Sequence, residues 1–136
     1  MIRKVDHIGI AVRDLEKSIA LWADVFNLKE PEIEEIIERK VRIAEFPLKG
    51  GSFLELISPL GEDSPVAKFL DSKGEGIHHF CFEVEDIEKD IENLMNKGIK
   101  FVQNWPHEGA KGHSIAFIHP RNLNGVLIEL KEKARR

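Results

Sequence analysis

The chain has 136 residues, a formal net charge of −4 at pH 7 and a hydrophobic content of 42%. This length is typical of one ordinary domain, so we expect a single domain over residues 1–136 that needs no disulfide, and the lone cysteine, Cys81, favours a reducing, intracellular setting. Acidic and basic residues are mixed along the sequence without the basic stripe that binds phosphate backbones, so nucleic acid is not an expected partner.

The N-terminal residues predict a strand that leads into a helix. Asp6, His7 and Arg13 interrupt the apolar stretch before it is long enough for a signal-peptide core or a membrane span, so we expect a cytoplasmic protein with no membrane partner. Asp14 can accept hydrogen bonds from the free N–H groups at the start of a helix. The residues after it place apolar side chains on one helical face, and these are Leu15, Ile19, Trp22 and Phe26.

Three strands are predicted after this helix. They lie at about residues 32–37, 41–48 and 53–58. The last two are joined by the tight-turn sequence KGGS at residues 49–52. A linker follows at about residues 61–73, where Ser64 can cap a short helix that begins at Pro65 and ends at glycines. The first part of the chain therefore has the order strand, helix, strand, strand, strand, written βαβββ.

The sequence then repeats this pattern. VDHIGIAVRDLEKSI at residues 5–19 aligns without a gap to IHHFCFEVEDIEKDI at residues 77–91, so that Asp86 occupies the position of Asp14. The later strands of the second copy are predicted at about residues 99–104, 113–119 and 126–131. We therefore predict an α+β protein of two βαβββ modules, whose mixed sheets form a half-open barrel around a cleft. The modules are predicted at about residues 1–60 and 74–132.

Strand alternation separates the two faces of each predicted sheet, because successive side chains point to opposite sides and the side under a helix must be apolar. In the first strand the apolar residues from Ile8 onward belong under the helix, which directs His7 to the opposite, cleft-lining face. In the second copy the same rule directs His79, rather than its neighbour His78, to the cleft. Two histidines at matching positions of the repeat are thus predicted to line the cleft.

Two glutamates are predicted to join these histidines. In the strands FLELIS and VLIEL, apolar residues flank Glu55 and Glu129, so both carboxylates point into the cleft. Carboxylates that converge in a semi-enclosed cleft repel each other unless a cation or a proton lies between them. Two imidazoles and two carboxylates suit one divalent cation, and zinc, cobalt, nickel, manganese and ferrous iron all accept such ligands. The predicted metal ligands are His7, Glu55, His79 and Glu129.

The sequence resembles the vicinal oxygen chelate superfamily, which comprises glyoxalases, bleomycin resistance proteins and extradiol dioxygenases, over nearly its whole length. Within it, the segments VDHIGIAV, LELISPLGEDSPVAKFL, GEGIHHFCFEV and HPRNLNGVLIEL are most similar to the methylmalonyl-CoA epimerase family. The resemblance implies the same four metal ligands, with cobalt favoured and zinc, nickel or manganese as alternatives, and an acyl-CoA substrate. A homodimer is expected as well, since exposed edge strands favour self-association.

The reaction implied by this resemblance interconverts the epimers of methylmalonyl-CoA. The proton at the carbon between carboxylate and thioester is removed and returned through a metal-stabilised enolate. Inversion needs an acid–base group on each side of that carbon, and the resemblance implies Glu129 as one of them. The second glutamate of some family members falls at Ile43 here, so we predict Glu45, two residues further on the same face, with His113 or His119 as alternatives. The competing interpretation of Glu45 is an exposed edge-strand carboxylate without a catalytic role.

Three other functions occur on this architecture and compete with the epimerase interpretation. Lactoylglutathione lyase (glyoxalase I) would use the same ligands for a similar proton shift next to a carbonyl, so the ligands do not separate it from an epimerase. An extradiol dioxygenase is disfavoured, because the fourth ligand Glu55 leaves less room for substrate and oxygen. A non-catalytic small-molecule binding protein of the same fold would not need the full ligand set.

Overall fold

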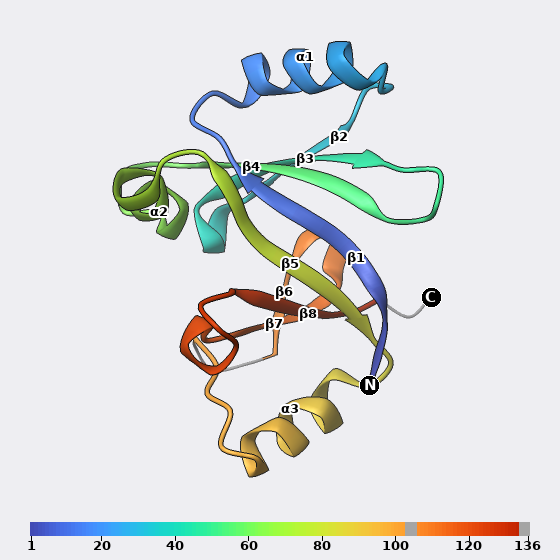
Figure 1. The fold of residues 1–136 in the computed structure, drawn as a ribbon, viewed down its shortest axis with the longest axis vertical. Coiled ribbons are helices and arrows are strands. Elements are labelled where there is room, and N and C mark those ends of the chain that lie inside the picture. Colours follow the sequence, from blue (N-terminus) through green and yellow to red (C-terminus); the bar gives the residue numbers. More distant parts are fainter. Residues whose placement is uncertain (103–105, 134–136) are drawn as a thin grey trace. The chain divides into compact units, whose positions relative to one another are not determined.

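The computed structural model describes residues 1–102 and 106–133, and these residues form two compact units. We call His7–His78 the repeat-1 unit, and we call Met1–Asp6 together with the described residues from His79 onward the repeat-2 unit. The first strand, β1 (Ile2–Ala11), contributes to both (Figure 1). Across the described residues, no helix has the length and apolar character needed to cross a membrane.

The repeat-1 unit has the predicted βαβββ order. Its elements after β1 are α1 (Leu15–Phe26), β2 (Glu32–Ile36), the 3-10 turn η1 (Ile37–Arg39), β3 (Val41–Pro47), β4 (Phe53–Pro59) and α2 (Pro65–Lys73). The sheet order is β2-β3-β4-β1, in which β3 pairs antiparallel with both β2 and β4, and β1 pairs parallel with β4. Strand β3 therefore has a neighbour on each side.

Side-chain caps start both helices of this unit. The Asp14 carboxylate accepts a hydrogen bond from the Lys17 N–H at 3.0 Å, which confirms the predicted N-cap of α1. The Ser64 hydroxyl accepts one from the Val66 N–H at 3.2 Å and begins α2, also as predicted. At the end of α1, Asn27 adopts a left-handed conformation with φ of 53°, which stops the helix.

The core of the repeat-1 unit lies between α1 and one face of the sheet (Figure 1). Its buried residues are Val12, Leu15, Ala44, Phe46 and Leu56. Ile19 and Trp22 pack against this cluster as predicted. Phe26 was predicted on the same face, but it is 61% exposed, because it lies in the last turn of α1 and stacks on Trp22 rather than on the sheet.

The repeat-2 unit follows the same plan with shorter strands. Its elements are β5 (Gly76–Val84, mostly within this unit), α3 (Ile87–Asn96), β6 (His107–Glu108), η2 (Ala110–Gly112), β7 (Ser114–Ile118), η3 (Pro120–Asn122) and β8 (Ile128–Glu132). The order is β5-β8-β7-β6, with β5 parallel to β8 and the other pairs antiparallel. The Asp86 carboxylate accepts from the Lys89 N–H at 3.1 Å, so the repeat mate of Asp14 is also an N-cap.

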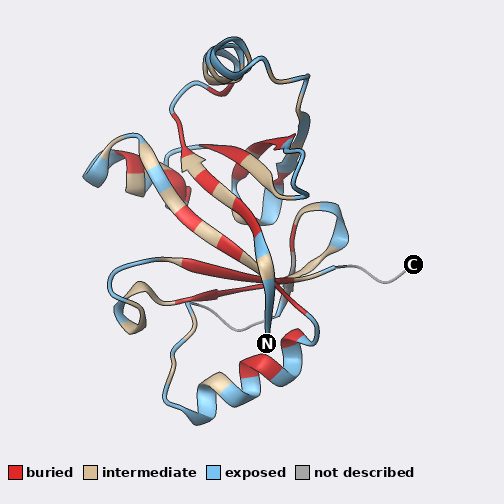
Figure 2. Cartoon of the chain, turned by 45° about the vertical axis from the view of Figure 1, so that its right-hand side comes forward, coloured by how far each residue is buried: buried red, intermediate tan, exposed pale blue. Residues whose placement is uncertain are grey.

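Helix α3 covers one face of this second sheet. Figure 2 shows it with buried residues on one side and mostly exposed residues elsewhere. Ile87 and Ile91 of α3 are buried against strand residues of the same cluster. The strand residues are Val84, Ala116, Ile118, Ile128 and Leu130. Each unit thus buries one apolar sheet face under a helix. Polar side chains that form a site are therefore expected on the opposite face of the sheet.

The strand predicted at residues 99–104 is shortened, over its described part, to a single bridge with the end of β7. Phe101 forms an isolated antiparallel bridge with Ile118, flanked by hydrogen bonds from the Val102 N–H to the Phe117 carbonyl and from the His119 N–H to the Lys100 carbonyl, both at 2.9 Å. Besides β8, the strand that pairs with β7 is β6, at His107–Glu108. Residues 103 and 104 lie outside the described residues. Ile99 and Phe101 pack against the core beneath α3, so the apolar pattern of this segment reflects that packing more than a long ladder. The ends of the other predicted strands differ by one or two residues.

Candidate metal and acid–base site

The repeat-1 unit brings together His7 of β1 and Glu55 of β4. His7 Nε2 lies 3.4 Å from Glu55 Oε2, and both side chains are buried, with exposed fractions of 4% and 6%. Strand register explains the contact, since Glu55 pairs with Gly9, two residues from His7 and therefore on the same face. Gly9 has no side chain to separate them.

Glu45 joins this pair from the neighbouring strand. It lies directly opposite Glu55 in the β3–β4 register and is 6% exposed. One ligand atom from each of His7, Glu45 and Glu55 lies within 4.8 Å of the others. Glu45 is therefore neither an exposed residue nor part of an edge strand, which removes the competing interpretation of this carboxylate.

A third glutamate extends the row to the next strand. Glu32 of β2 lies opposite Glu45, but it is exposed, and it was not among the predicted site residues. Its position could have been found by extending the alternation of β3 across a predicted hairpin to β2. Side chains directly opposite on adjacent strands are close neighbours, and like charges there repel. The buried pair Glu45 and Glu55 therefore suits a divalent cation or a shared proton, and with the His7 nitrogen it forms a donor set that fits such a cation.

The repeat-2 unit contains the matching histidine–glutamate pair. His79 Nε2 of β5 lies 3.1 Å from Glu129 Oε1 of β8, and the side chains are 1% and 7% exposed. Glu129 pairs with Cys81, two residues after His79, so alternation places both groups on one face, which we call the ligand face of the repeat-2 unit. Phe117, opposite Glu129 on β7, holds the imidazole in an edge-to-face contact with ring centroids 5.8 Å apart.

His78 takes a different environment from His79. Its ring contacts Phe69 of α2 edge-to-face, with centroids 4.9 Å apart, within the repeat-1 unit. The one-residue difference follows from the two-residue period of the strand, which turns neighbouring side chains to opposite sides. This agrees with the choice of His79 over His78 as the candidate ligand.

The two histidines considered as alternative acid–base groups have separate settings. His119 Nδ1 accepts a hydrogen bond from the Arg121 N–H at 3.1 Å and caps the turn η3, so this ring nitrogen is used to shape the loop. His113 precedes β7 and is partly buried. Burial first, and then the positive charge of Lys131, lower the pKa of His113 below its usual value of 6.5, so its neutral form is favoured.

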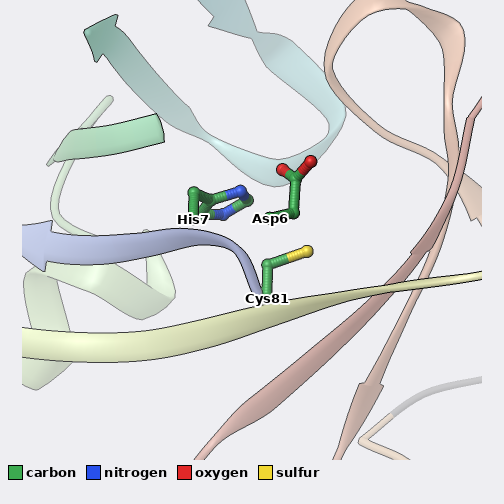
Figure 3. A group of neighbouring side chains, drawn as sticks. All are labelled: Asp6, His7 and Cys81. Atoms are coloured by element: carbon green, nitrogen blue, oxygen red, sulfur yellow. The ribbon is translucent and has the colours of Figure 1, made fainter. Parts of the chain in front are cut away.

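A buried ion pair that the sequence analysis missed lies on the repeat-2 unit. Lys131 Nζ of β8 donates to Asp6 Oδ2 of β1 at 2.9 Å, and Asp6 is fully buried. Cys81 is fully buried as well, and its sulfur lies within 4.8 Å of an Asp6 carboxylate oxygen. Figure 3 shows these two side chains, with His7 following Asp6 along β1. The partners are 125 positions apart, so no local pattern could have predicted the pair.

The chain belongs to the glyoxalase/bleomycin resistance protein/dioxygenase superfamily, because residues 6–117 match that family. The resemblance inferred from the sequence motifs is thereby confirmed. Enzymes of this superfamily bind a divalent metal, and the buried donor groups of the chain agree with that property.

Among individual relatives, an uncharacterized protein of Bacillus subtilis, YqjC, is 40% identical over 131 residues, covering 96% of this chain and 93% of the relative. The mitochondrial methylmalonyl-CoA epimerase of Dictyostelium discoideum is 35% identical over 133 residues, covering 97% of this chain and 80% of the relative. A solved structure of a Streptomyces coelicolor methylmalonyl-CoA epimerase variant, in complex with 2-nitronate-propionyl-CoA, has a TM-score of 0.92 and 34% identity, covering 99% of this chain and 100% of that chain. This agreement confirms the predicted α+β fold of two βαβββ modules.

Proposed function

We propose that the chain is a methylmalonyl-CoA epimerase, an isomerase that inverts the carbon between the carboxylate and the thioester of its acyl-CoA substrate. The observation that carries this proposal is the combination of near-complete coverage by epimerase relatives with a buried histidine–glutamate pair in each repeat. Epimerisation is favoured over the lactoylglutathione lyase alternative, because the relatives above with a stated activity are epimerases.

We propose His7, Glu55, His79 and Glu129 as the metal ligands. Each pair is buried, each combines an imidazole nitrogen with a carboxylate oxygen, and the two pairs occupy matching positions of the repeat. This donor chemistry suits cobalt, our first choice, as well as zinc, nickel or manganese. When bound, the cation supplies Lewis-acid stabilisation of the negative charge that proton removal leaves on the substrate.

Glu129 and Glu45 are proposed as the two acid–base groups. In one direction the ionised carboxylate of one glutamate takes the proton from the substrate carbon, and the electron pair of the broken C–H bond moves toward the thioester carbonyl. The protonated carboxyl of the other glutamate then donates its proton to the opposite side of the same carbon, which completes the inversion without an outside reactant. Glu45 is preferred to His119, whose ring caps a turn, and to His113, because it lies within 4.8 Å of His7 and Glu55 atoms.

Two further features stay proposals. A homodimer is expected, and light scattering of the purified chain would measure its mass. A cytoplasmic location is expected, and fractionation of cells that express the chain would test it.

The central experiment follows deuterium exchange. The cobalt-loaded chain is incubated with one methylmalonyl-CoA epimer in heavy water, while deuterium uptake and epimer composition are measured. We expect exchange and inversion that stop when a chelator removes the cation, and absence of metal-dependent exchange would refute the proposal. A parallel assay with the glutathione–methylglyoxal adduct tests the lyase alternative.

A matched pair of variants tests the second acid–base group. Glu45→Gln should abolish most turnover, whereas Glu32→Gln removes an exposed carboxylate opposite Glu45 and should leave turnover unchanged. If Glu45→Gln retained the same turnover as Glu32→Gln and the unaltered chain, Glu45 would be excluded from the reaction.

A further inference from the structure

The buried ion pair of Lys131 and Asp6 has no part in the reaction proposed above. Lys131 Nζ and Asp6 Oδ2 lie 2.9 Å apart, and their side chains are only 9% and 0% exposed. Both residues belong to the repeat-2 unit. A buried ion pair is a weak source of stability, because an apolar pair of similar size is often as stable or more stable. Its presence therefore calls for an explanation other than stability.

Along β8, Lys131 is the next residue whose side chain lies on the same face as that of Glu129, the ligand face of the repeat-2 unit. The two side chains share that face because they are separated by two positions on β8, a distance of about 6.6 Å along a strand. The register agrees, since Glu129 lies opposite Phe117 and Lys131 opposite Ile115 on β7. A lysine carries its ammonium on a flexible four-carbon chain, which reaches a carboxylate at such a distance.

An ammonium at this place competes with a metal cation for Glu129. Both are attracted by the same carboxylate, and the attraction is strong where water is excluded. In this structure the Lys131 ammonium donates to Asp6. Asp6 is also the residue before His7 on β1, so its side chain is held by the strand that carries another proposed ligand.

We propose that Asp6 is a positioning residue that holds the Lys131 ammonium away from the Glu129 carboxylate and so keeps Glu129 available to the cation. This inference rests on the proposed function, since it requires Glu129 to bind a metal. It assigns a role to Asp6 that does not involve contact with substrate.

Glu83 of β5 offers a matched control. It is a buried carboxylate of the same unit, and it lies opposite Lys131 in the β5–β8 register. Its own partners are cations at the surface, with Arg3 Nε at 3.4 Å and Lys133 Nζ at 3.3 Å. Loss of Glu83 therefore frees exposed cations, which water and salt screen, and leaves the pair of Lys131 with Asp6 in place.

The experiment compares the full chain with Asp6→Asn, Lys131→Met, the double variant and Glu83→Gln. The readout is the rise in Tm with added Co²⁺, which reports affinity even for a destabilised variant. Asp6→Asn should need about 10–100-fold more Co²⁺ than the unaltered chain, the usual cost of losing a group that supports a metal ligand. Lys131→Met and the double variant should bind Co²⁺ at least as tightly as the unaltered chain, and Glu83→Gln should match it.

The Lys131→Met variant separates this role from simple anchoring. If the ion pair only anchored β8 to β1, Lys131→Met would weaken Co²⁺ binding as much as Asp6→Asn, and that result would overturn the proposal. Co²⁺ binding by Asp6→Asn equal to that of the unaltered chain would overturn it too. If Asp6→Asn is unfolded without metal, the Co²⁺ concentration that refolds it is compared with that for the double variant.

Failure of the proposed function gives a different result. The unaltered chain would then bind Co²⁺ without exchanging deuterium into methylmalonyl-CoA, while the order of Co²⁺ affinities among the variants would still test Asp6. Conversely, epimerisation by the unaltered chain with equal Co²⁺ affinity in all variants would leave the function standing and refute the role of Asp6.

Discussion

Replacing Glu45 by glutamine should stabilise the metal-free protein while it removes activity. Glu45 and Glu55 face each other on β3 and β4, both buried, with ligand oxygens within 4.8 Å. Two unit charges at that distance repel by about 3.5 kcal/mol at an effective dielectric constant of about 20, and by about 1 kcal/mol in water. For a chain of this length, 1 kcal/mol corresponds to a change of about 3–5 °C in Tm. We therefore expect the metal-free Tm of Glu45→Gln to rise by several degrees, and kcat to fall by about 10²–10⁴-fold.

The assay is a thermal melt of the metal-free protein at pH 8 and low salt, where histidine side chains are ordinarily neutral and exposed charges are least screened. Saturating cobalt should reduce or reverse the difference, because the cation neutralises the repulsion in the unaltered chain. Glu32→Gln is the control, and as an exposed substitution it should change stability by no more than about 0.5 kcal/mol. A metal-free Tm of Glu45→Gln at or below that of the unaltered chain would refute the electrostatic reasoning, and unchanged turnover would refute the catalytic role.

Three further predictions concern metal, packing and pH. A chelator should lower the Tm of the cobalt-loaded chain and restoration of cobalt should recover it, whereas an unchanged Tm would argue against a bound cation. Gly109→Ala should destabilise the chain by about 1–3 kcal/mol, because a Cβ there would lie 2.8 Å from the Ile115 side chain, while Gly50→Ala, with nothing within 4 Å, is the control in urea unfolding. The folded chain holds the pKa of His113 below 6.5, so stability present above that pH is lost as the unfolded state takes up a proton at lower pH. Between pH 7.5 and 5.5, the Tm of His113→Gln should therefore fall less steeply than that of the unaltered chain. Equal slopes of Tm against pH for the two proteins would contradict this.

The helix starts and the faces of the strands were predictable because they depend on local chemistry. Asp14, Ser64 and Asp86 each accept a hydrogen bond from the first turn of the following helix, and that interaction spans two or three residues. The two-residue period of a strand likewise separated His79 from His78 without reference to any other element. The same period paired Glu55 with the face of His7.

The errors arose where packing rather than sequence period decided the outcome. Phe101 has the alternation of a strand residue, but it is partly buried against the core beneath α3 and forms a single bridge, to Ile118. Phe26 has helical spacing, but α1 ends there and the ring remains exposed. In both cases the apolar spacing was recognised correctly, but the surface on which the side chain packs was not predicted. That surface comes from segments elsewhere in the chain.

The sequence by itself determined the repeat, the capped helices and the face on which His7, Glu55, His79 and Glu129 lie, since these follow from residue spacing and strand period. Only the tertiary structure decided that Glu45 is buried opposite Glu55, because this requires the flanking strands and their register. It alone brought Lys131 to Asp6 across 125 positions. Contacts between distant segments depend on how the chain packs, and no local property of either segment encodes that arrangement.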